Sequence, residues 1–139
     1  MLQTRQVLGV EMMIGRSREE EKLRSWDMST VEKVLVRDGH TQDEAKAMIE
    51  EYRKYMGVVI AFPGEAHAMS TAVDPAWHAH IIDTRDYAAF CEEVHGRFIH
   101  HQISVDGNPL PVTGTVKRFI ELYGEADPKW WGRSICCQG

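Results

Sequence analysis

A capping box followed by an amphipathic stripe is the feature that most constrains the fold of this chain. Thr41 and Glu44 are three residues apart, so the threonine hydroxyl and the glutamate carboxylate can each satisfy a backbone amide in a first helical turn. Behind them, five apolar residues follow at helical spacing: Ala45, Met48, Ile49, Tyr52 and Met56. This pattern predicts a helix that begins beside Thr41 and buries one face.

Four shorter patterns predict further helices. The first follows Ser29-Thr30 as a cap and ends at Asp38-Gly39. The second begins with Asp74 as N-cap and covers residues 74–82. The third follows Asp83 or Thr84 and ends at Gly96, and the last ends at Gly124.

Two segments are left open by their patterns. Residues 57–63 (GVVIAFP) fit either a short buried strand or the apolar end of the preceding helix, because length alone does not decide between them. Residues 125–139 have no helical period and are expected to be irregular. The fold class predicted is therefore mainly α: a single small helical domain with long loops, in which residues 1–25 form a loosely ordered arm and residues 26–139 form the helical, metal-binding domain.

Composition narrows the function classes. The chain has 139 residues, a net charge of -5 and basic residues scattered without a cluster, which argues against a nucleic-acid or anionic membrane surface. No apolar run approaches the roughly 20 residues that span a bilayer. Three cysteines, without a recognisable export signal, do not make a disulfide framework. A cytoplasmic protein is expected, with the identity of any protein or small-molecule partner left open.

Histidines are concentrated between residues 73 and 101, a segment that holds five of the seven in the chain. Imidazole and thiolate are ligands that zinc, copper and iron favour. Packing alone rarely calls for so many imidazoles, since a buried imidazole must also find hydrogen-bond partners. The candidate ligands are these: His78, His80, Cys91, His100 and His101, with Cys136 and Cys137 of the tail as further possibilities.

The spacing of His78 and His80 limits how both could bind one ion. On a regular helix, residues two apart point about 200° away from each other. Either the segment is distorted, or only one of the two is a ligand. If it is helical, His80 shares a face with Trp77, and His78 shares one with Asp74, whose carboxylate could orient the His78 ring.

The other candidate ligands have alternative roles. His100 and His101 are adjacent and point apart in most conformations, so one is expected to be a ligand and the other a surface residue or partner. Cys91 lies among apolar neighbours and fits a small core residue as well as a ligand. Trp77 and Tyr87 are candidate walls of a pocket beside the ion.

The hypothesis from the residues is a protein that binds one transition-metal ion, zinc first, with copper or iron as alternatives. A small metalloenzyme, with hydrolytic zinc or oxidative copper or iron chemistry, is the second possibility; whether there is turnover is left open. A metal-free protein-interaction domain, whose histidines form hydrogen bonds in the core, is the third.

The same residues resemble a known family. The pattern D-x-x-W-H-x-H-I from Asp74, followed by Tyr87, Cys91 and His100-His101, is similar to the glycine-rich domain-containing protein-like family. The resemblance covers residues 28–101 and implies no particular reaction. One departure concerns the loop over a pocket, because Gln102 and the residues after it replace the proline and aromatic residue common in that family.

Overall fold

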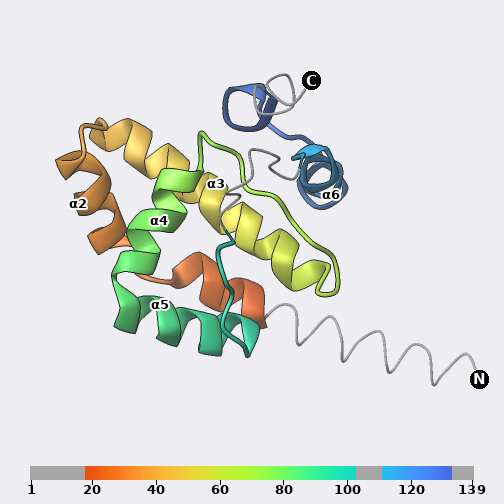
Figure 1. Cartoon of the computed structure of the whole chain (residues 1–139), viewed down its shortest axis with the longest axis horizontal. Helices are drawn as coiled ribbons and strands as arrows, with labels where there is room; N and C mark the ends of the chain where they lie inside the picture. The colour runs from red at the N-terminus through yellow and green to blue at the C-terminus, as the bar shows by residue number, and fades with distance from the viewer. Residues whose placement is uncertain (1–17, 103–110, 133–139) are drawn as a thin grey trace, which may run out of the picture.

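All regular secondary structure is helical in the part of the chain that the computed structural model describes, residues 18–102 and 111–132 (Figure 1). Residues 18–25 form the first helix. The later elements are α2 (Ser29–Arg37), α3 (Gln42–Ala61), α4 (Asp74–Ile82), α5 (Thr84–Phe90), η1 (Cys91–His95), α6 (Thr113–Tyr123) and η2 (Pro128–Gly132). No strand occurs in these ranges, and the predicted mainly α class is confirmed.

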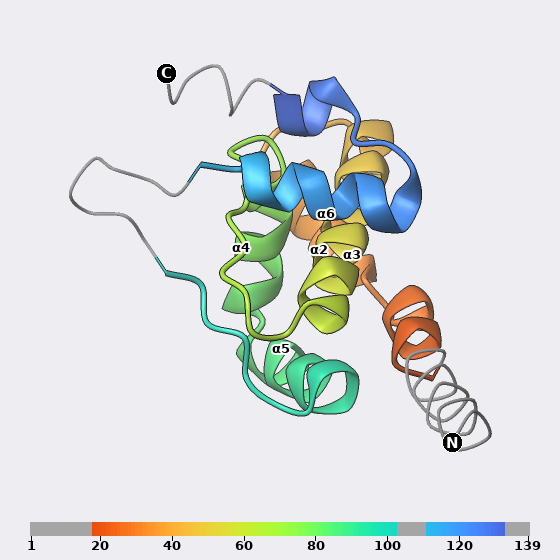
Figure 2. The same ribbon diagram turned by 90° about the vertical axis from the view of Figure 1, so that its right-hand side faces the viewer.

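Helix α3 is the central element, and it begins as predicted. The Glu44 backbone N–H donates to the Thr41 hydroxyl at 3.1 Å. The helix continues past Gly57 to Ala61. Of the two alternatives for residues 57–63, the end of a helix is therefore the one observed, and not a strand. The reason lies in packing: α3 contacts α2, α4 and α6, and buried residues continue along its full length (Figure 2).

Helices α2 and α4 pack against each other and against α3. The inner face of α2 carries the buried side chains of Val31 and Leu35. The predicted caps were wrong by a residue or two. Helix α2 begins at Ser29, whose N–H donates to the Asp27 carboxylate at 2.9 Å, and α4 begins at Asp74 with Val73 in the capping position.

Helix α5 widens into a π-helix before it ends. Residues Cys91–His95 form η1, and Gly96 follows in the left-handed conformation with φ of 74°. Gly124 ends α6 in the same way, with φ of 85°. Both glycines therefore end helices as predicted, since a left-handed residue costs glycine least.

The C-terminal part of the described chain closes over α3. A side chain at Gly57 would overlap the Tyr123 hydroxyl, which donates to the Lys54 carbonyl at 3.0 Å. Beyond α6 the expectation of an irregular segment was wrong for Pro128–Gly132, which form η2. There Trp131 is 1% exposed and packs against Tyr55 and Phe119, and this burial holds the short helix in place.

The N-terminal prediction is covered only in part. Residues 18–25 are helical, Leu23 is buried in the core, and Arg53 donates to the Leu23 carbonyl at 2.7 Å. Residues 1–17 lie outside the described ranges, and the division at residue 25 stays a prediction. None of the described helices combines the length and the apolar character needed to cross a membrane.

Candidate functional site

The buried His80 lies at the centre of a hydrogen-bonded chain of side chains that joins three helices. Its side chain is 0% exposed. Nε2 lies 2.8 Å from the Asp86 carboxylate of α5, and Nδ1 lies 2.7 Å from the Tyr52 hydroxyl of α3. A carboxylate only accepts, so Nε2 carries the proton and Nδ1 accepts from Tyr52. The Trp26 indole N–H donates to the same Asp86 oxygen at 3.0 Å, which completes the chain.

The surroundings of His80 favour its neutral form. Burial lowers the pKa of His80, and the hydrogen bond from its ring to Asp86 only partly opposes this effect. Burial also raises the pKa of Tyr52 well above its ordinary value, so its hydroxyl remains a donor. The His80 ring stacks on Tyr87 with centroids 5.2 Å apart and contacts Phe90 at 4.9 Å. Both ring nitrogens are therefore occupied inside a packed aromatic core.

His101 forms a second, partly exposed pair. Its Nε2 donates to the Asp74 carboxylate at 2.5 Å, and its ring stacks on Trp77 with centroids 4.2 Å apart. The side chain of His101 is 22% exposed and that of Asp74 is 42% exposed. Nδ1 of His101 is buried and has no hydrogen-bond partner within the described part of the chain.

Tyr87 links the core around His80 to the segment that contains His101. Its hydroxyl accepts from the Trp77 indole N–H at 3.0 Å and donates to the Ile99 carbonyl at 2.5 Å. The Ile99 N–H donates to the Cys91 sulfur at 3.5 Å. Cys91 is 0% exposed, and burial raises the pKa of its thiol, so it acts here as a weak acceptor in the core.

Residues 98–102 have no regular secondary structure and contact α4 through His101 and α5 through Ile99 (Figure 2). Their exposure alternates: Phe98, His100 and Gln102 are exposed, whereas Ile99 is buried and His101 is half-buried. The ring centroids of Phe98 and His100 are 4.8 Å apart. One irregular segment therefore covers the aromatic core of a helical domain.

The structure separates the predicted ligands. His80 and Cys91 lie in the core, His101 lies at its edge, and His78 and His100 are exposed. Helix α4 is regular, so His78 and His80 face opposite ways, as one of the two predicted arrangements requires. Within residues 18–102 and 111–132, no three His, Cys, Asp or Glu side chains are grouped closely enough to hold a metal ion. Cys136 and Cys137 lie outside these ranges.

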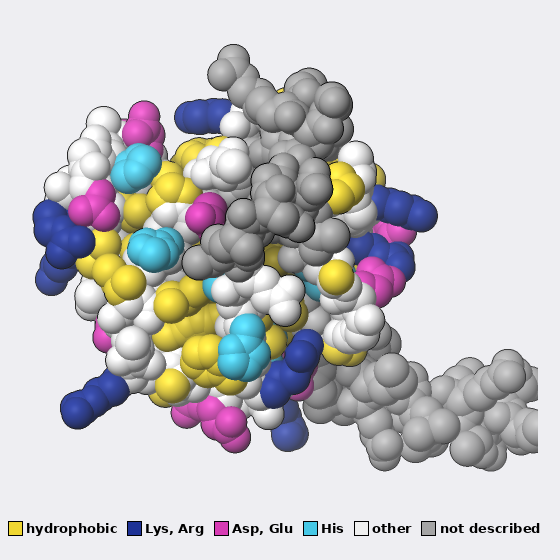
Figure 3. All heavy atoms as spheres, viewed as in Figure 1, with side chains coloured by type: hydrophobic (Ala, Val, Ile, Leu, Met, Phe, Trp, Pro, Cys, Tyr) yellow, Lys and Arg dark blue, Asp and Glu magenta, His cyan; other side chains and the backbone are white. Residues whose placement is uncertain are grey.

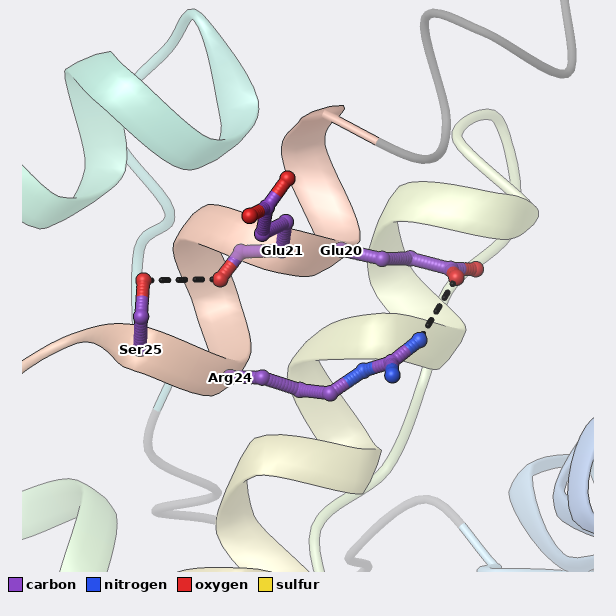
Figure 4. A pocket seen from close by; sticks show the side chains of 4 residues that line it. All are labelled: Glu20, Glu21, Arg24 and Ser25. Atoms are coloured by element: carbon purple, nitrogen blue, oxygen red, sulfur yellow. Dashed lines mark hydrogen bonds and ion pairs between the residues drawn. The ribbon is translucent and has the colours of Figure 1, made fainter.

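Two expected roles differ from those observed. Asp74 pairs with His101 and not with His78. Trp77 and Tyr87, the expected pocket walls, are 5% and 1% exposed and bond to each other, so they fill the core. The surface hollow of Figure 4 lies elsewhere, along the first helix. It is lined by Glu20, Glu21, Arg24 and Ser25, where Arg24 pairs with Glu20 at 3.3 Å.

Sequence reasoning missed Asp86 as the partner of His80. Asp86 is six residues after His80, across the break between α4 and α5, and that spacing does not place two residues on one face of a helix. The partner Trp26 is 60 residues away along the chain. Only Tyr52 had a signal, because it belongs to the stripe that predicted α3.

His95 was also missed as a half-buried histidine with a buried Nε2. Its ring meets Phe90 edge-on with centroids 5.7 Å apart, and its buried Nε2 has no hydrogen-bond partner among the described residues. Burial, with a smaller effect of Arg97, lowers the pKa of His95 to about 4. The histidine is therefore neutral in the folded protein at pH 7.

Comparisons with known proteins give one positive result. Comparison with curated proteins found no match, and comparison with solved structures found none. The expected kinship with the glycine-rich domain-containing protein-like family was wrong, because the family model that matches, over residues 18–107, is a different one. The pattern from Asp74 to His101 therefore did not identify the family. By a match that covers more than half of its length, the chain belongs to the UCP032817-like family.

Proposed function

We propose that this protein is a metal-independent protein-interaction domain in which buried histidines stabilise the core and exposed ones contribute to a binding face. The observation that supports this most strongly is the bonding of His80, since both of its ring nitrogens have protein partners. A metal ligand needs a free lone pair on one nitrogen. His80 could supply one only by giving up its bond to Tyr52 or to Asp86 inside a packed core.

The binding face proposed consists of Phe98, His100, His78 and Ile82. Phe98 is 49% exposed and Ile82 is 50% exposed, although both belong to residue types that are usually buried. Figure 3 shows hydrophobic side chains with histidines among them over α4, α5 and the segment that covers them. Apolar side chains beside aromatic and imidazole rings suit a protein surface better than a nucleic acid, and the net charge of -5 adds to that preference.

A cytoplasmic location goes with this proposal. Cys91 is a free thiol in the core, which suits a reducing compartment. The lack of a cluster of basic residues in the sequence also gives no reason to propose binding to an anionic membrane surface.

A transition-metal site is the second candidate, and one contact favours it. His101 already lies against Asp74, and His78 follows Asp74 by four residues on α4, which places the two on one side of the helix. If His78 turned towards Asp74, the three side chains could hold zinc, or copper or iron. Three protein ligands would leave a position open for water, as a metalloenzyme requires.

Elemental analysis separates the two candidates. Untagged protein is purified without chelators or added metal, beside His78→Ala, His101→Ala and the control His40→Ala, whose histidine is remote from Asp74 in sequence and pairs with Glu44. The proposal expects well under one equivalent of zinc, copper or iron in all four proteins, and an unchanged melting temperature when zinc is added. Near one equivalent in wild type and His40→Ala, lost in the other two variants, would overturn it.

A further inference from the structure

The carboxyl group of Glu51 is buried where the C-terminal part of the described chain meets α3. Glu51 is 7% exposed, and its Oε2 has no hydrogen-bond partner within the described residues. The indole N–H of Trp131 in η2 lies near enough to favour the charged carboxylate, yet its Nε1 is also buried without a hydrogen bond of normal geometry. A buried carboxylate without strong hydrogen bonds is costly in its charged form.

The charged groups around Glu51 offset its burial only in part. Lys54, also on α3, has its Nζ 3.8 Å from Oε2, but its side chain is 46% exposed, so this ion pair is weak. Asp127 and Glu125, which precede η2, repel a charge on Glu51. Tyr123 of α6 also faces Glu51 and stays neutral, because burial raises its pKa to about 12. The surroundings of Glu51 therefore favour its protonated form.

We propose that residues 125–132 form a strap that closes over α3 while Glu51 is protonated and loosens when Glu51 is ionised. The strap itself carries the two carboxylates that repel a charged Glu51, so ionisation acts directly on its docking. In the closed strap, Trp131 packs against the rings of Tyr55 and Phe119. Loosening uncovers these two rings. This inference goes beyond the proposed function, because it concerns neither the histidines nor the binding face around them.

The direction of the pH effect follows from the two states of the strap. In the open strap Glu51 is in contact with water and has an ordinary pKa near 4.5, whereas burial under the closed strap raises that pKa. Closure is therefore favoured most below about pH 4.5 and weakens as the pH rises through the raised pKa. His80 and His95 act in the opposite direction, since their neutral forms stabilise the fold at higher pH. A measurement local to the strap separates the two effects.

Hydrogen exchange at the backbone amides of Trp130 and Trp131 reports opening of the strap, because both N–H groups donate to the Asp127 carbonyl at 3.0 Å. A helix as short as η2 does not persist without packing, so undocking exposes these amides. Protection factors, with intrinsic exchange rates divided out, are measured on the full chain from about pH 5 to about pH 7.5. Glu51→Gln cannot ionise, and the control Glu50→Gln removes a neighbouring carboxylate that is 67% exposed.

The proposal expects a specific difference between these proteins. Over this pH interval, protection in wild type and Glu50→Gln should fall at least about threefold relative to protection in Glu51→Gln. The same pH dependence in wild type and Glu51→Gln would overturn the proposal. Circular dichroism checks that both variants keep their helices.

Titration of Glu51 tests the same coupling from the other side, because a strap that responds to ionisation must also change the ionisation. The carboxyl carbon of Glu51 is followed by 13C NMR in wild type and in Trp131→Ala, which lacks the side chain that anchors the strap. Glu51 is expected to titrate clearly above 4.5 in wild type and near 4.5 in the variant, with exposed Glu50 unchanged. An ordinary pKa of Glu51 in wild type, or the same raised pKa in both proteins, would overturn the proposal.

Discussion

The two histidine regions of this protein differ in what they leave unsatisfied. Around His80, side-chain hydrogen bonds link Tyr52, His80, Asp86 and Trp26. Both ring nitrogens of His80 have a partner, and the ring is not exposed to solvent. Along Phe98 to His101 exposed side chains alternate with buried or half-buried ones, and Nδ1 of His101 has no hydrogen-bond partner in the described ranges. Histidine thus stabilises the core in the first region and lies at or near the surface in the second. The number of histidines in the sequence does not distinguish these two roles.

The largest expected effect on stability comes from breaking the hydrogen bonds of His80. His80→Ala leaves the Tyr52 hydroxyl and the Asp86 carboxylate without their partner and opens a cavity, so we expect the free energy of unfolding to fall by about 3 kcal/mol. Urea unfolding measures this change. A loss under 1 kcal/mol would mean that the hydrogen bonds of His80 contribute little to stability.

A smaller effect is expected where the two regions meet. Tyr87→Phe removes the hydroxyl between the Trp77 indole and the Ile99 carbonyl, and leaves both buried groups unpaired. We expect a loss of about 2 kcal/mol in urea unfolding, with faster hydrogen exchange at Ile99. If exchange at Ile99 stays unchanged, the hydroxyl does not hold the segment in place.

Acidification should lower the free energy of unfolding by an amount similar to that expected for Tyr87→Phe. His80 and His95 have lowered pKa values in the folded state, whereas unfolded histidine titrates near 6.5. Their contribution is complete above about pH 6.5 and is lost as the pH falls, because the unfolded chain then binds more protons. With a folded pKa of about 4, His95 alone should cost about 2 kcal/mol between pH 7 and pH 5.

The variant His95→Gln isolates that effect, since it removes the titrating ring and leaves the carboxylates in place. Its unfolding free energy should fall less than that of wild type over the same pH interval. Equal slopes for the two proteins would contradict a buried, neutral His95.

The smallest effect is expected on the exposed face. His78→Ala, two residues before His80 on the same helix, should change the free energy of unfolding by under 0.5 kcal/mol, because the ring is exposed. It is the matched control for His80→Ala. A loss comparable with that of His80→Ala would abolish the distinction between the two faces of α4.

Local rules predicted most of the fold. Thr41 capped α3 as expected, and Gly96 and Gly124 ended helices, because these signals depend on backbone geometry within one turn. The end of α3 and the two π-helices were not predicted. Whether residues 57–61 continue a helix, and whether a turn takes an extra residue, depends on packing against distant elements.

The candidate site was less accessible to prediction. The helical repeat was enough to separate His78 from His80. Apart from Tyr52, the hydrogen-bonded network around His80 was not readable, since Asp86 bonds to His80, and Trp26 to Asp86, only through the packing of segments that are separate in the sequence. The different exposure of Phe98 and Ile99 was likewise indicated by no period in the sequence.

The bonding of His80 is tested most directly by nitrogen NMR of the imidazole rings in 15N-labelled protein at pH 7. We predict one neutral ring with a protonated Nε2 and an accepting Nδ1, with no change when one equivalent of zinc is added. A His80 ring that is doubly protonated, that carries its proton on Nδ1, or whose nitrogen signals shift as zinc binds would contradict the account.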